Sequence, residues 1–441
     1  MKDSVELQKK NHHSWFEWAQ LFIYLSIPVV IIIYTVIQNN NDISIAEKNR
    51  RQDLEIDERR HKQDIELAEQ RRQQDIFLAA EQQEEDILLN YFNSLGKLLE
   101  KHGVNLNETA VGRRIGRFTT LAALNQLNSK RKTLVIVSLI ENTLLTIQKD
   151  RYPTISLSSA NLTGLNLTGK FQLSKQIECV SLDATILTNA SFQDAQFWSW
   201  SFKNSYLINS DFSSSNGLSI ACLDGSSLYS VNFADSTLDG SNFVGAHYYR
   251  ANFMKTSLEN AQMRYFTCNE CNFEGATIDL AYLNGALFDN SEFLNIKMSS
   301  TFLHATQIHR SNLHRANLLN VNATQTTLQL CNFFDATLIN NTFVESIIFD
   351  TSFVFATLTN SSFVKTSLSN TSFDEANMHN VDFSHAECHH CHFRMTNLTH
   401  TKFTNTSLNG SDFTGAEITY EQLKLARSLQ DVILPNGTRI N

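Results

Sequence analysis

Three different spacings of apolar residues divide this chain into segments. Residues 15–38 contain a continuous apolar run, and residues 41–95 repeat every eleven positions. Residues 84–151 show helical spacing without a repeat, and residues 155–423 repeat every five positions. Because helices return to the same face every 3.6 residues and strands every two, each change of spacing predicts a change of structure.

Residues 15–38 predict a transmembrane helix that comes after a polar tail at residues 1–14. Ala19 to Ile37 is free of charge, and 19 helical residues span roughly 28 Å, close to a hydrocarbon core of about 30 Å. Pro28 is expected to kink this helix. The alternative is a buried helix of a soluble protein, but nothing nearby in the sequence would cover it on all sides. Aromatic residues near the ends suit interface anchors: Trp15, Trp18, Tyr24 and Tyr34.

Basic residues near the apolar run are almost evenly divided between its two sides. Lys2, Lys9 and Lys10 precede the run. Cytosolic flanks are enriched in Lys and Arg, and the count tips toward the C-terminal side only farther from the run. We therefore expect a single-pass membrane protein whose C-terminal part is cytosolic. The basic residues on that side are Lys48, Arg50, Arg51, Arg59, Arg60 and Lys62.

Residues 41–95 predict a long charged helix, called the stalk below. Eleven residues make three turns at 3.67 residues per turn, so each repeat returns to almost the same face. The apolar residues form two narrow stripes on nearly opposite faces of the helix. Two interpretations remain open: self-association through the stalk, or a lone solvated spacer helix. The Leu54 stripe comprises Leu54, Ile65, Ile76 and Ile87, and the Ile56 stripe comprises Ile56, Leu67, Leu78 and Leu89.

Residues 84–151 predict a small helical domain that caps one end of the five-residue repeat. Its first helix continues the stalk up to Gly103, the second ends near Asn128, and the third runs over Leu134 to Leu145 with Ser129 as N-cap. The domain also carries a dense basic set, for which pairing with the acidic stalk is favoured over a phosphate or lipid headgroup site. That set is Arg113, Arg114, Arg117, Lys130, Arg131 and Lys132.

The five-residue repeat of residues 155–423 predicts a solenoid. Leu, Phe, Ile or Met occupies nearly every fifth position from Leu157, and the residue two positions earlier is usually small. One residue is gained between Phe212 and Leu218, after which the register continues to Leu423. A strict period of this kind indicates a repeat architecture in which each unit stacks on its neighbours.

The pattern A(D/N)LXX resembles the pentapeptide-repeat family. The resemblance implies a mainly β fold, a right-handed quadrilateral parallel β-helix with four pentapeptides per coil, in which each central residue and the small residue point inward. Every twentieth centre from Phe233 to Phe413 is Phe, with Leu313 as the exception, whereas the column from Leu238 has no aromatic residue. We expect these two columns to face each other, and stacked asparagines such as Asn232 and Asn252 to bond between coils.

Both ends of the chain add to this resemblance. Residues 419–441 predict a C-terminal cap, because Thr419 and Gln422 form a capping box that opens a short helix. An apolar run, a charged stalk and a helical domain in this order look like membrane-anchored pentapeptide-repeat proteins, a group whose function is largely unassigned. The resemblance therefore supplies a layout but no mechanism.

Two Cys-x-x-Cys pairs are the strongest candidates for metal or redox chemistry. In the five-residue register, Cys268 and Cys388 are centres, whereas Cys271, Cys391 and Cys331 are small inward positions. Free Cys commonly serves as a small buried apolar side chain. We therefore predict that all five fill the interior.

Six histidines crowd one stretch of the repeat. A zinc site needs three or four ligands at about 2 Å from the ion, and in a twenty-residue coil only residues about twenty apart become neighbours. Of the six, only His379 and His400 meet that condition. We predict no metal site, no catalytic residues and no cofactor. The six are His379, His385, His389, His390, His392 and His400.

Composition and charge limit the functions that remain. With 15 Gly and 3 Pro in 441 residues, the chain has few loop-forming residues, and its net charge is −9. The leading hypothesis is a membrane-anchored, non-enzymatic scaffold that binds the bilayer through residues 15–38 and an unknown protein on the solenoid faces. The alternative is a DNA-mimicking modulator of a topoisomerase, as the family resemblance implies. Residues 155–420 hold 22 acidic and 12 basic residues, which is dilute for such a mimic, and no nucleic-acid partner is expected.

Overall fold

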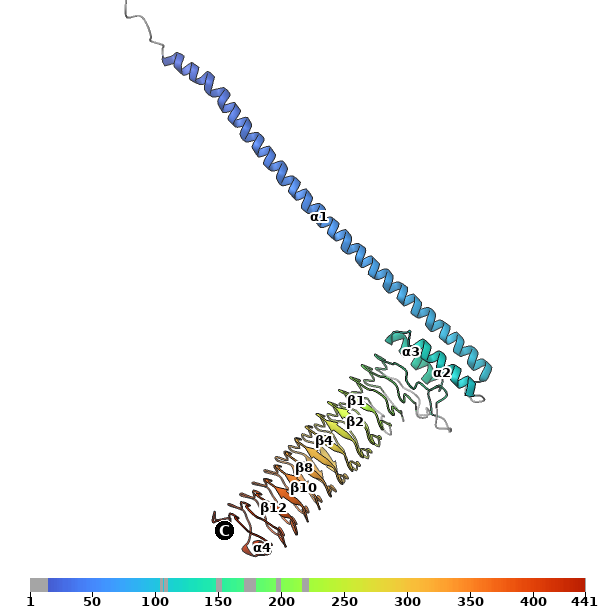
Figure 1. The fold of residues 1–441 in the computed structure, drawn as a ribbon, viewed down its shortest axis with the longest axis vertical. Coiled ribbons are helices and arrows are strands. Elements are labelled where there is room, and N and C mark those ends of the chain that lie inside the picture. Colours follow the sequence, from blue (N-terminus) through green and yellow to red (C-terminus); the bar gives the residue numbers. More distant parts are fainter. Residues whose placement is uncertain are drawn as a thin grey trace, which may run out of the picture. The chain divides into compact units, whose positions relative to one another are not determined.

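The computed structural model describes residues 15–103, 106, 110–147, 153–169, 180–195, 200–215 and 222–440. The chain divides into two compact units, Met1–Gln83 and Glu84–Asn441, and each is described by itself (Figure 1). The predicted polar tail at residues 1–14 lies outside the described residues.

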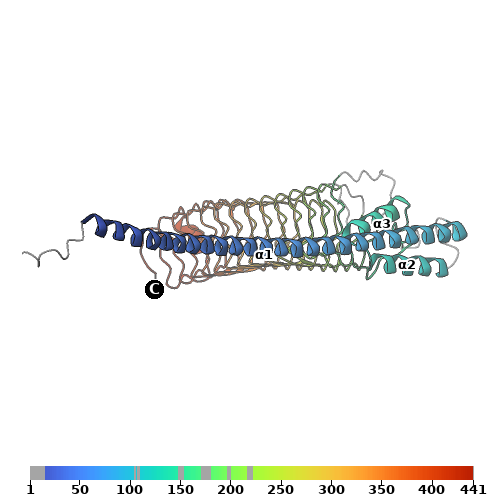
Figure 2. The same cartoon turned by 90° about the horizontal axis from the view of Figure 1, so that it is seen from above.

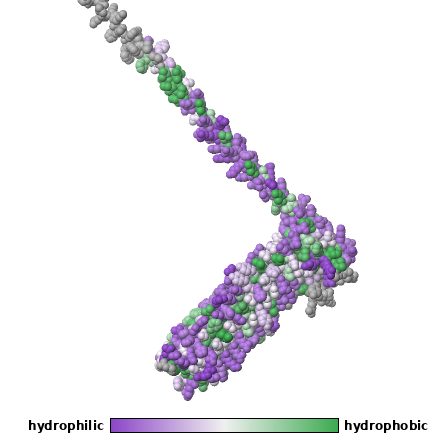
Figure 3. All heavy atoms as spheres, viewed as in Figure 1, coloured by the Kyte–Doolittle hydropathy of each residue, from purple (hydrophilic) through white to green (hydrophobic). Residues whose placement is uncertain are grey.

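The first unit is formed by the greater part of helix α1 (Trp15–His102). The apolar run and the stalk, expected as separate helices, are one continuous helix that includes Pro28. Nothing between residues 38 and 41 interrupts it, because asparagine is unfavourable but tolerated inside a helix. The beginning of α1 is long and apolar enough, by its length and composition, to cross a membrane. Figure 3 shows hydrophobic residues near the start of α1 and hydrophilic residues along most of its remaining length.

The second unit begins with the end of α1, after which come α2 (Ala110–Leu124) and α3 (Ser129–Glu141). The Tyr91 hydroxyl lies 3.0 Å from the Thr120 Oγ1 atom, and Arg131 pairs with Glu84 at 3.0 Å. The predicted pairing between the basic set and the acidic end of the stalk therefore holds for Arg131. The predicted N-cap is wrong by one residue: Asn128 caps α3, because its side chain accepts from the Arg131 amide.

The boundaries of the second and third helices also differ from those predicted. The second helix ends at Leu124, and the third begins at Ser129 and ends at Glu141, because Lys130 and Thr133 extend it before its first apolar residue. The buried side chains of the three helices form one cluster with the first residues of the solenoid. Arg117 donates to the Ser158 carbonyl at 2.7 Å, which joins α2 to that first coil.

The solenoid is a parallel β-helix with four pentapeptides per coil, as predicted. Paired strands are twenty residues apart, as in Leu228 with Tyr248 and Met298 with Leu318. One parallel sheet contains β1 (Ser227–Tyr229), β2 (His247–Tyr249), β3 (Thr267–Asn269), β4 (Leu287–Asp289), β6 (Gln307–His309), β8 (Thr327–Gln329), β10 (Ile347–Phe349), β11 (Ser367–Ser369) and β12 (Glu387–His389). A second contains β5 (Lys297–Ser299), β7 (Asn317–Leu319) and β9 (Thr337–Ile339). Figure 2 shows the coils stacked in series from α2 and α3 toward the C-terminus.

The predicted register shift appears in the pairing of the early coils. Tyr206 pairs with Ser227, 21 residues later, whereas Cys222 pairs with Asn242 at the ordinary spacing of twenty. The extra residue therefore lies between Asp211 and Cys222, a range that contains the interval predicted from the sequence. The first coil is longer still, because Asn161 pairs with Ile186 at a spacing of 25.

The interior is filled by stacked columns of central residues. Phe373 stacks on Phe353 at 5.1 Å and on Phe393 at 5.2 Å, measured between ring centroids. It also meets Phe363 and Phe383 edge to face at 6.0 and 5.9 Å. These edge-to-face contacts show that the column facing Phe373 lies ten residues away along the chain.

The prediction that the Leu238 column faces the Phe233 column is therefore wrong. With four sides per coil, a column five residues away lies on the adjacent side, and the facing column begins at Phe243. Phe243 meets Phe233 edge to face at 6.5 Å. Two facing columns thus supply rings that interlock across a narrow interior.

Polar side chains connect each coil to the one before it. Inward Thr side chains donate to carbonyls of the preceding coil, as Thr306 does to Leu283 at 2.8 Å. The predicted asparagine ladder is present, because Asn252 Nδ2 donates to Asn232 Oδ1 at 3.0 Å. Where Glu292 interrupts this ladder, its carboxylate accepts instead from a neighbouring asparagine. The carbonyls, which also accept a backbone N–H of their own coil, thereby pair hydroxyls that would otherwise be costly to bury.

The corners of the coils require an unusual backbone conformation. The residue two positions after each centre has a positive φ, and many of these residues are not glycine, such as Lys255 at 54° and Leu280 at 58°. A left-handed conformation costs a non-glycine residue roughly 1–2 kcal/mol. The repeated backbone and side-chain contacts between coils offset this cost, which explains why so few glycines suffice.

The C-terminal end is closed by α4 (Tyr420–Lys424) and the segment after it. The predicted capping box between Thr419 and Gln422 is present. Gln422 also donates to the carbonyls of Leu398 and Thr401 at 2.8 and 2.9 Å. The five-residue register does not continue as β-structure to Leu423, which lies on α4 and is buried. A helix therefore covers the open end of the last coil.

Replacing Phe373 by Ala should lower the free energy of unfolding by about 3–5 kcal/mol, because the ring is fully buried between four others. Replacing Tyr265, which is 68% exposed, should change it by less than about 0.5 kcal/mol. Denaturant titration of the two variants measures the difference. Equal losses would contradict the proposed packing of the interior.

Candidate functional site

The five cysteines at inward register positions are all buried, as predicted from the repeat. Burial raises the pKa of the Cys331 thiol to about 12 and the pKa of Cys388 well above its ordinary value. For Cys388 a second, smaller cause is the neighbouring Cys391. Thiolates are the forms that attack electrophiles and bind metals, so these thiols are held in their unreactive form.

The two Cys-x-x-Cys pairs differ in one respect that the sequence did not predict. Cys268 and Cys271 form a disulfide bond, whereas Cys388 and Cys391 are free. The two pairs occupy equivalent register positions six coils apart, so no difference in register distinguishes them. The prediction that these cysteines fill the interior is confirmed, and in one coil a disulfide bond joins two of them.

The six histidines are spread over several corners and faces. The rings of His379 and His400 lie edge to face at 5.3 Å, as predicted for residues about one coil apart. His385 Nδ1 lies 2.9 Å from the Asn405 amide nitrogen, and His389 lies 3.6 Å from Glu387. Within the described residues, no group of three or more His, Cys, Asp or Glu side chains is arranged to hold a metal ion.

A maleimide should fail to react with Cys331, Cys388 and Cys391 in the native chain at pH 8, and should react with all three after unfolding in denaturant. Burial blocks access, and the raised pKa of Cys331 and Cys388 keeps these thiols protonated at this pH. Mass spectrometry of the labelled peptides measures the extent of labelling at each cysteine. Rapid native labelling of Cys388 would show that the interior opens at that coil.

Because the interior is closed, the outer faces carry the groups available to a partner. Many of their charged residues are paired between neighbouring coils. The outer faces therefore carry dispersed charge rather than a continuous electrostatic field of one sign. Arg250 and Glu270 are 2.7 Å apart, and this contact lowers the pKa of Glu270. Further pairs of this kind are Lys203–Asp224, Arg310–Asp289, Arg315–Asp335, Lys365–Glu345, Arg394–Asp374 and Lys402–Asp382, and Arg427–Glu387 joins residues two coils apart.

One outer face carries a cluster of aromatic side chains, called the tyrosine surface below, formed by Tyr206, Ile208, Tyr229, His247 and Tyr249. The rings of Tyr229 and Tyr249 stack at 5.2 Å, and the Tyr249 hydroxyl donates to a Glu270 carboxylate oxygen at 2.8 Å. A depression of about 260 Å³ lies over β1 and β2 between these side chains. The surface therefore combines exposed rings with ordered polar groups.

Reasoning from the sequence missed the tyrosine surface. Its signal was present, because Tyr206 lies one position before a centre, where this repeat usually places Asn, Ser or Thr, and Tyr229 and Tyr249 lie at the same position, one after a centre, in successive coils. Tyr206 is 55% exposed and Tyr229 is 44% exposed. Exposed aromatic side chains that stack in neighbouring coils are typical of binding surfaces rather than of solvent-facing walls.

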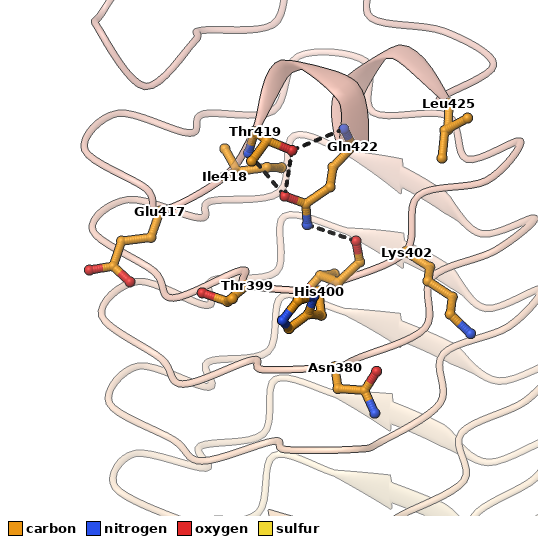
Figure 4. Close-up of a pocket in the computed structure, with 10 residues that line it drawn as sticks. Asn380, Thr399, His400, Lys402, Glu417, Ile418, Thr419, Gln422 and Leu425 are labelled. Atoms are coloured by element: carbon orange, nitrogen blue, oxygen red, sulfur yellow. Dashed lines mark hydrogen bonds between the residues drawn. The ribbon is translucent and has the colours of Figure 1, made fainter.

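A second candidate is a groove of about 740 Å³ beside the C-terminal cap (Figure 4). Ile418 and Leu425 border it next to α4, while His400 and Lys402 come from the coil below and Asn380 from the coil beneath that. The lining mixes apolar, amide and charged groups, and Lys402 is already paired with an aspartate at 3.8 Å. This arrangement offers contacts for a peptide segment but no paired acid and base.

Two segments of the chain match known family profiles. Residues 356–429 match a profile described as pentapeptide repeat region, and residues 232–264 match one described as pentapeptide repeats (8 copies). Neither description is that of a catalytic family. A comparison with curated protein sequences found no match.

Solved structures of several pentapeptide repeat proteins are similar to the solenoid. HetL, involved in heterocyst differentiation regulation in the cyanobacterium Nostoc sp. strain PCC 7120, is 20% identical over 59% of this chain and 91% of its own, with a TM-score of 0.26. A protein of the Arabidopsis thaliana thylakoid lumen is 27% identical over 24% and 79%, with a TM-score of 0.17. QnrB1, a plasmid-mediated fluoroquinolone resistance protein, is 15% identical over 50% and 94%, with a TM-score of 0.18.

The matched segments are parts of one repeat. Strand pairs and bridges twenty residues apart connect Cys222 to Glu417 coil by coil, through both segments and the coils between them. These coils share one interior and one set of inward positions. The profile matches and this common register together support the pentapeptide-repeat family for the solenoid of this chain.

Proposed function

We propose that this chain is a non-enzymatic scaffold, anchored in a membrane through residues 15–38, that binds a protein partner on the outer faces of its solenoid. The observation that carries the proposal is the closed interior, in which the central and small residues of the coils are buried. Function then depends on outward side chains, and a rigid solenoid presents many of them at fixed spacing. Such an arrangement suits multivalent binding.

Membrane anchoring is supported by the apolar beginning of α1, in which Ile27, Val30 and Ile31 are each more than half exposed. A bilayer stabilises an apolar helix whose side chains are exposed within its own unit. The proposal places the solenoid in the cytosol, on the distribution of Lys and Arg. A disulfide in one coil and free thiols in an equivalent coil favour neither side of the membrane.

Replacing Ile27 and Val30 by Arg should release the chain from membranes, because each Arg near the centre of a span costs roughly 2.5–3.5 kcal/mol. Alkaline extraction and then centrifugation measure the bound fraction. The unsubstituted chain should stay in the pellet, as should a control with Ile65 and Leu67 of the stalk replaced by Arg. Release of the unsubstituted chain by alkali would contradict anchoring.

The tyrosine surface is the proposed binding site for the partner protein. Its rings offer apolar area at a low cost in conformational entropy, and His247 and Glu270 supply polar contacts beside them. The stacked rings turn their edges outward, since Tyr229 and Tyr249 lie face to face with each other along the solenoid. A protein surface with apolar and hydrogen-bonding groups fits this arrangement.

Proximity labelling from the C-terminus of the full chain in intact cells tests binding and orientation together. Replacing Tyr229 and Tyr249 by Ser should remove a set of labelled proteins that the unsubstituted chain retains. The matched control replaces Tyr282 and Phe302 by Ser and should leave that set unchanged. These rings also stack outward, with centroids 4.8 Å apart, but they do not line the depression over β1 and β2. An identical set for all three chains would contradict binding at the tyrosine surface, and labelling of non-cytosolic proteins alone would contradict the orientation.

The DNA-mimicking alternative remains a prediction of the sequence that the same experiment tests. A mimic needs a continuous row of uncompensated carboxylates, whereas Asp289, Asp335 and Asp374 each face an arginine of a neighbouring coil. Labelling of topoisomerase or nucleoid proteins would favour the mimic over the scaffold.

A further inference from the structure

We propose that the stalk pairs in parallel with the stalk of a second copy of this chain, and that the Ile56 stripe forms the contact. In the first repeat the stripe begins at Ile45, so the contact comprises Ile45, Ile56, Leu67 and Leu78. The proposal deepens the proposed function by giving the scaffold a dimeric stem. It rests on the proposed membrane anchoring, because two stalks anchored in one membrane run in the same direction, as a parallel pair requires.

The stripe is exposed within its own unit. Ile45 is 57% exposed, Ile56 45%, Leu67 49% and Leu78 55%, and the described residues around them are exposed as well. A helix in a folded protein owes most of its stability to packing of an apolar face rather than to intrinsic propensity. This apolar stripe recurs over four repeats and is not buried within its own unit. We therefore infer that another chain buries it.

The end of α1 shows which of the two stripes is free. Ile87, the last member of the Leu54 stripe, is partly buried and packs against the core of the second unit. Leu89, the last member of the Ile56 stripe, is 56% exposed in that same unit. The chain thus uses the Leu54 stripe for its own packing where it has helices to do so, and leaves the Ile56 stripe to solvent.

The charges beside the Ile56 stripe favour a parallel pair. With eleven residues per three turns, the recurring Asp column, which includes Asp53 and Asp64, lies about 65° to one side of the stripe. Lys48 and Arg59 lie about 65° to the other side. In a parallel two-fold pair, opposite sides of the two helices meet, so Lys48 approaches the partner's Asp53 and Arg59 approaches the partner's Asp64. Farther along, Gln70 and Glu81 continue the Lys48 column, so the favourable pairs lie in the first half of the stalk.

The same columns disfavour other arrangements. In an antiparallel pair, like sides meet, and the Asp column of one helix would face the Asp column of the other. The Leu54 stripe offers one comparable cross-pair, Asp57 with the partner's Lys62, because alanines occupy that column in other repeats. Each favourable pair lies five residues apart between chains, the offset at which flanking charges meet in parallel coiled coils.

Cysteine cross-linking of the full chain in membranes tests the contact, since the stalk has no native cysteine. Ile56→Cys should give a covalent dimer of twice 50.1 kDa after mild oxidation. The matched control, Leu54→Cys on the opposite face, should give only the yield of the unsubstituted chain. Equal yields at the two positions, or no dimer above the unsubstituted chain, would overturn the proposal.

A charge exchange tests the parallel register separately. With Leu67→Cys as reporter, Arg59→Asp should lower the dimer yield several-fold, and adding Asp64→Arg should restore it, because the pair is rebuilt with its signs reversed. An unchanged yield in the first variant, or no recovery in the second, would overturn the assigned pairing. Alkaline extraction of the same membranes reports anchoring independently, and cross-linking of purified full-length chain tests the contact if anchoring fails.

Discussion

The packing of one central side chain from each pentapeptide into a narrow interior is the interaction on which the rest of this structure depends. Neighbouring coils of a parallel β-helix are separated by the strand spacing of about 4.7–4.9 Å. The stacked rings of Phe353, Phe373 and Phe393 are separated by 5.1 and 5.2 Å. Ring stacking and backbone pairing therefore favour the same rise per coil, and each reinforces the other.

This constraint divides the five positions of the repeat between stability and function. The centre must be apolar and the residue two before it must be small, often with a hydroxyl that bonds to the preceding coil. The remaining three positions point outward or form corners, and they tolerate charge pairs, asparagine ladders and aromatic clusters. Binding specificity can then differ among proteins of this architecture while the solenoid stays the same.

Much of the fold can be predicted from the sequence because its signals are local or repeat at a fixed interval. The coil length, the register shift after Phe212, the burial of Cys388 and the capping box at Thr419 all depend on residue type and position alone. The facing of the Phe columns also follows from four sides per coil, because opposite sides are ten residues apart, and the prediction was wrong because it paired columns only five residues apart. The Cys268–Cys271 disulfide and the packing of the tyrosine surface instead depend on distances that no spacing rule supplies.

The most direct test of this account is a double-mutant cycle on the facing residues Phe363 and Phe373. Their rings meet edge to face at 6.0 Å, so replacing each by Leu, singly and together, should reveal a coupling of about 1 kcal/mol in the free energy of unfolding. Additive losses, within about 0.3 kcal/mol, would contradict an interior built from interlocking opposite columns.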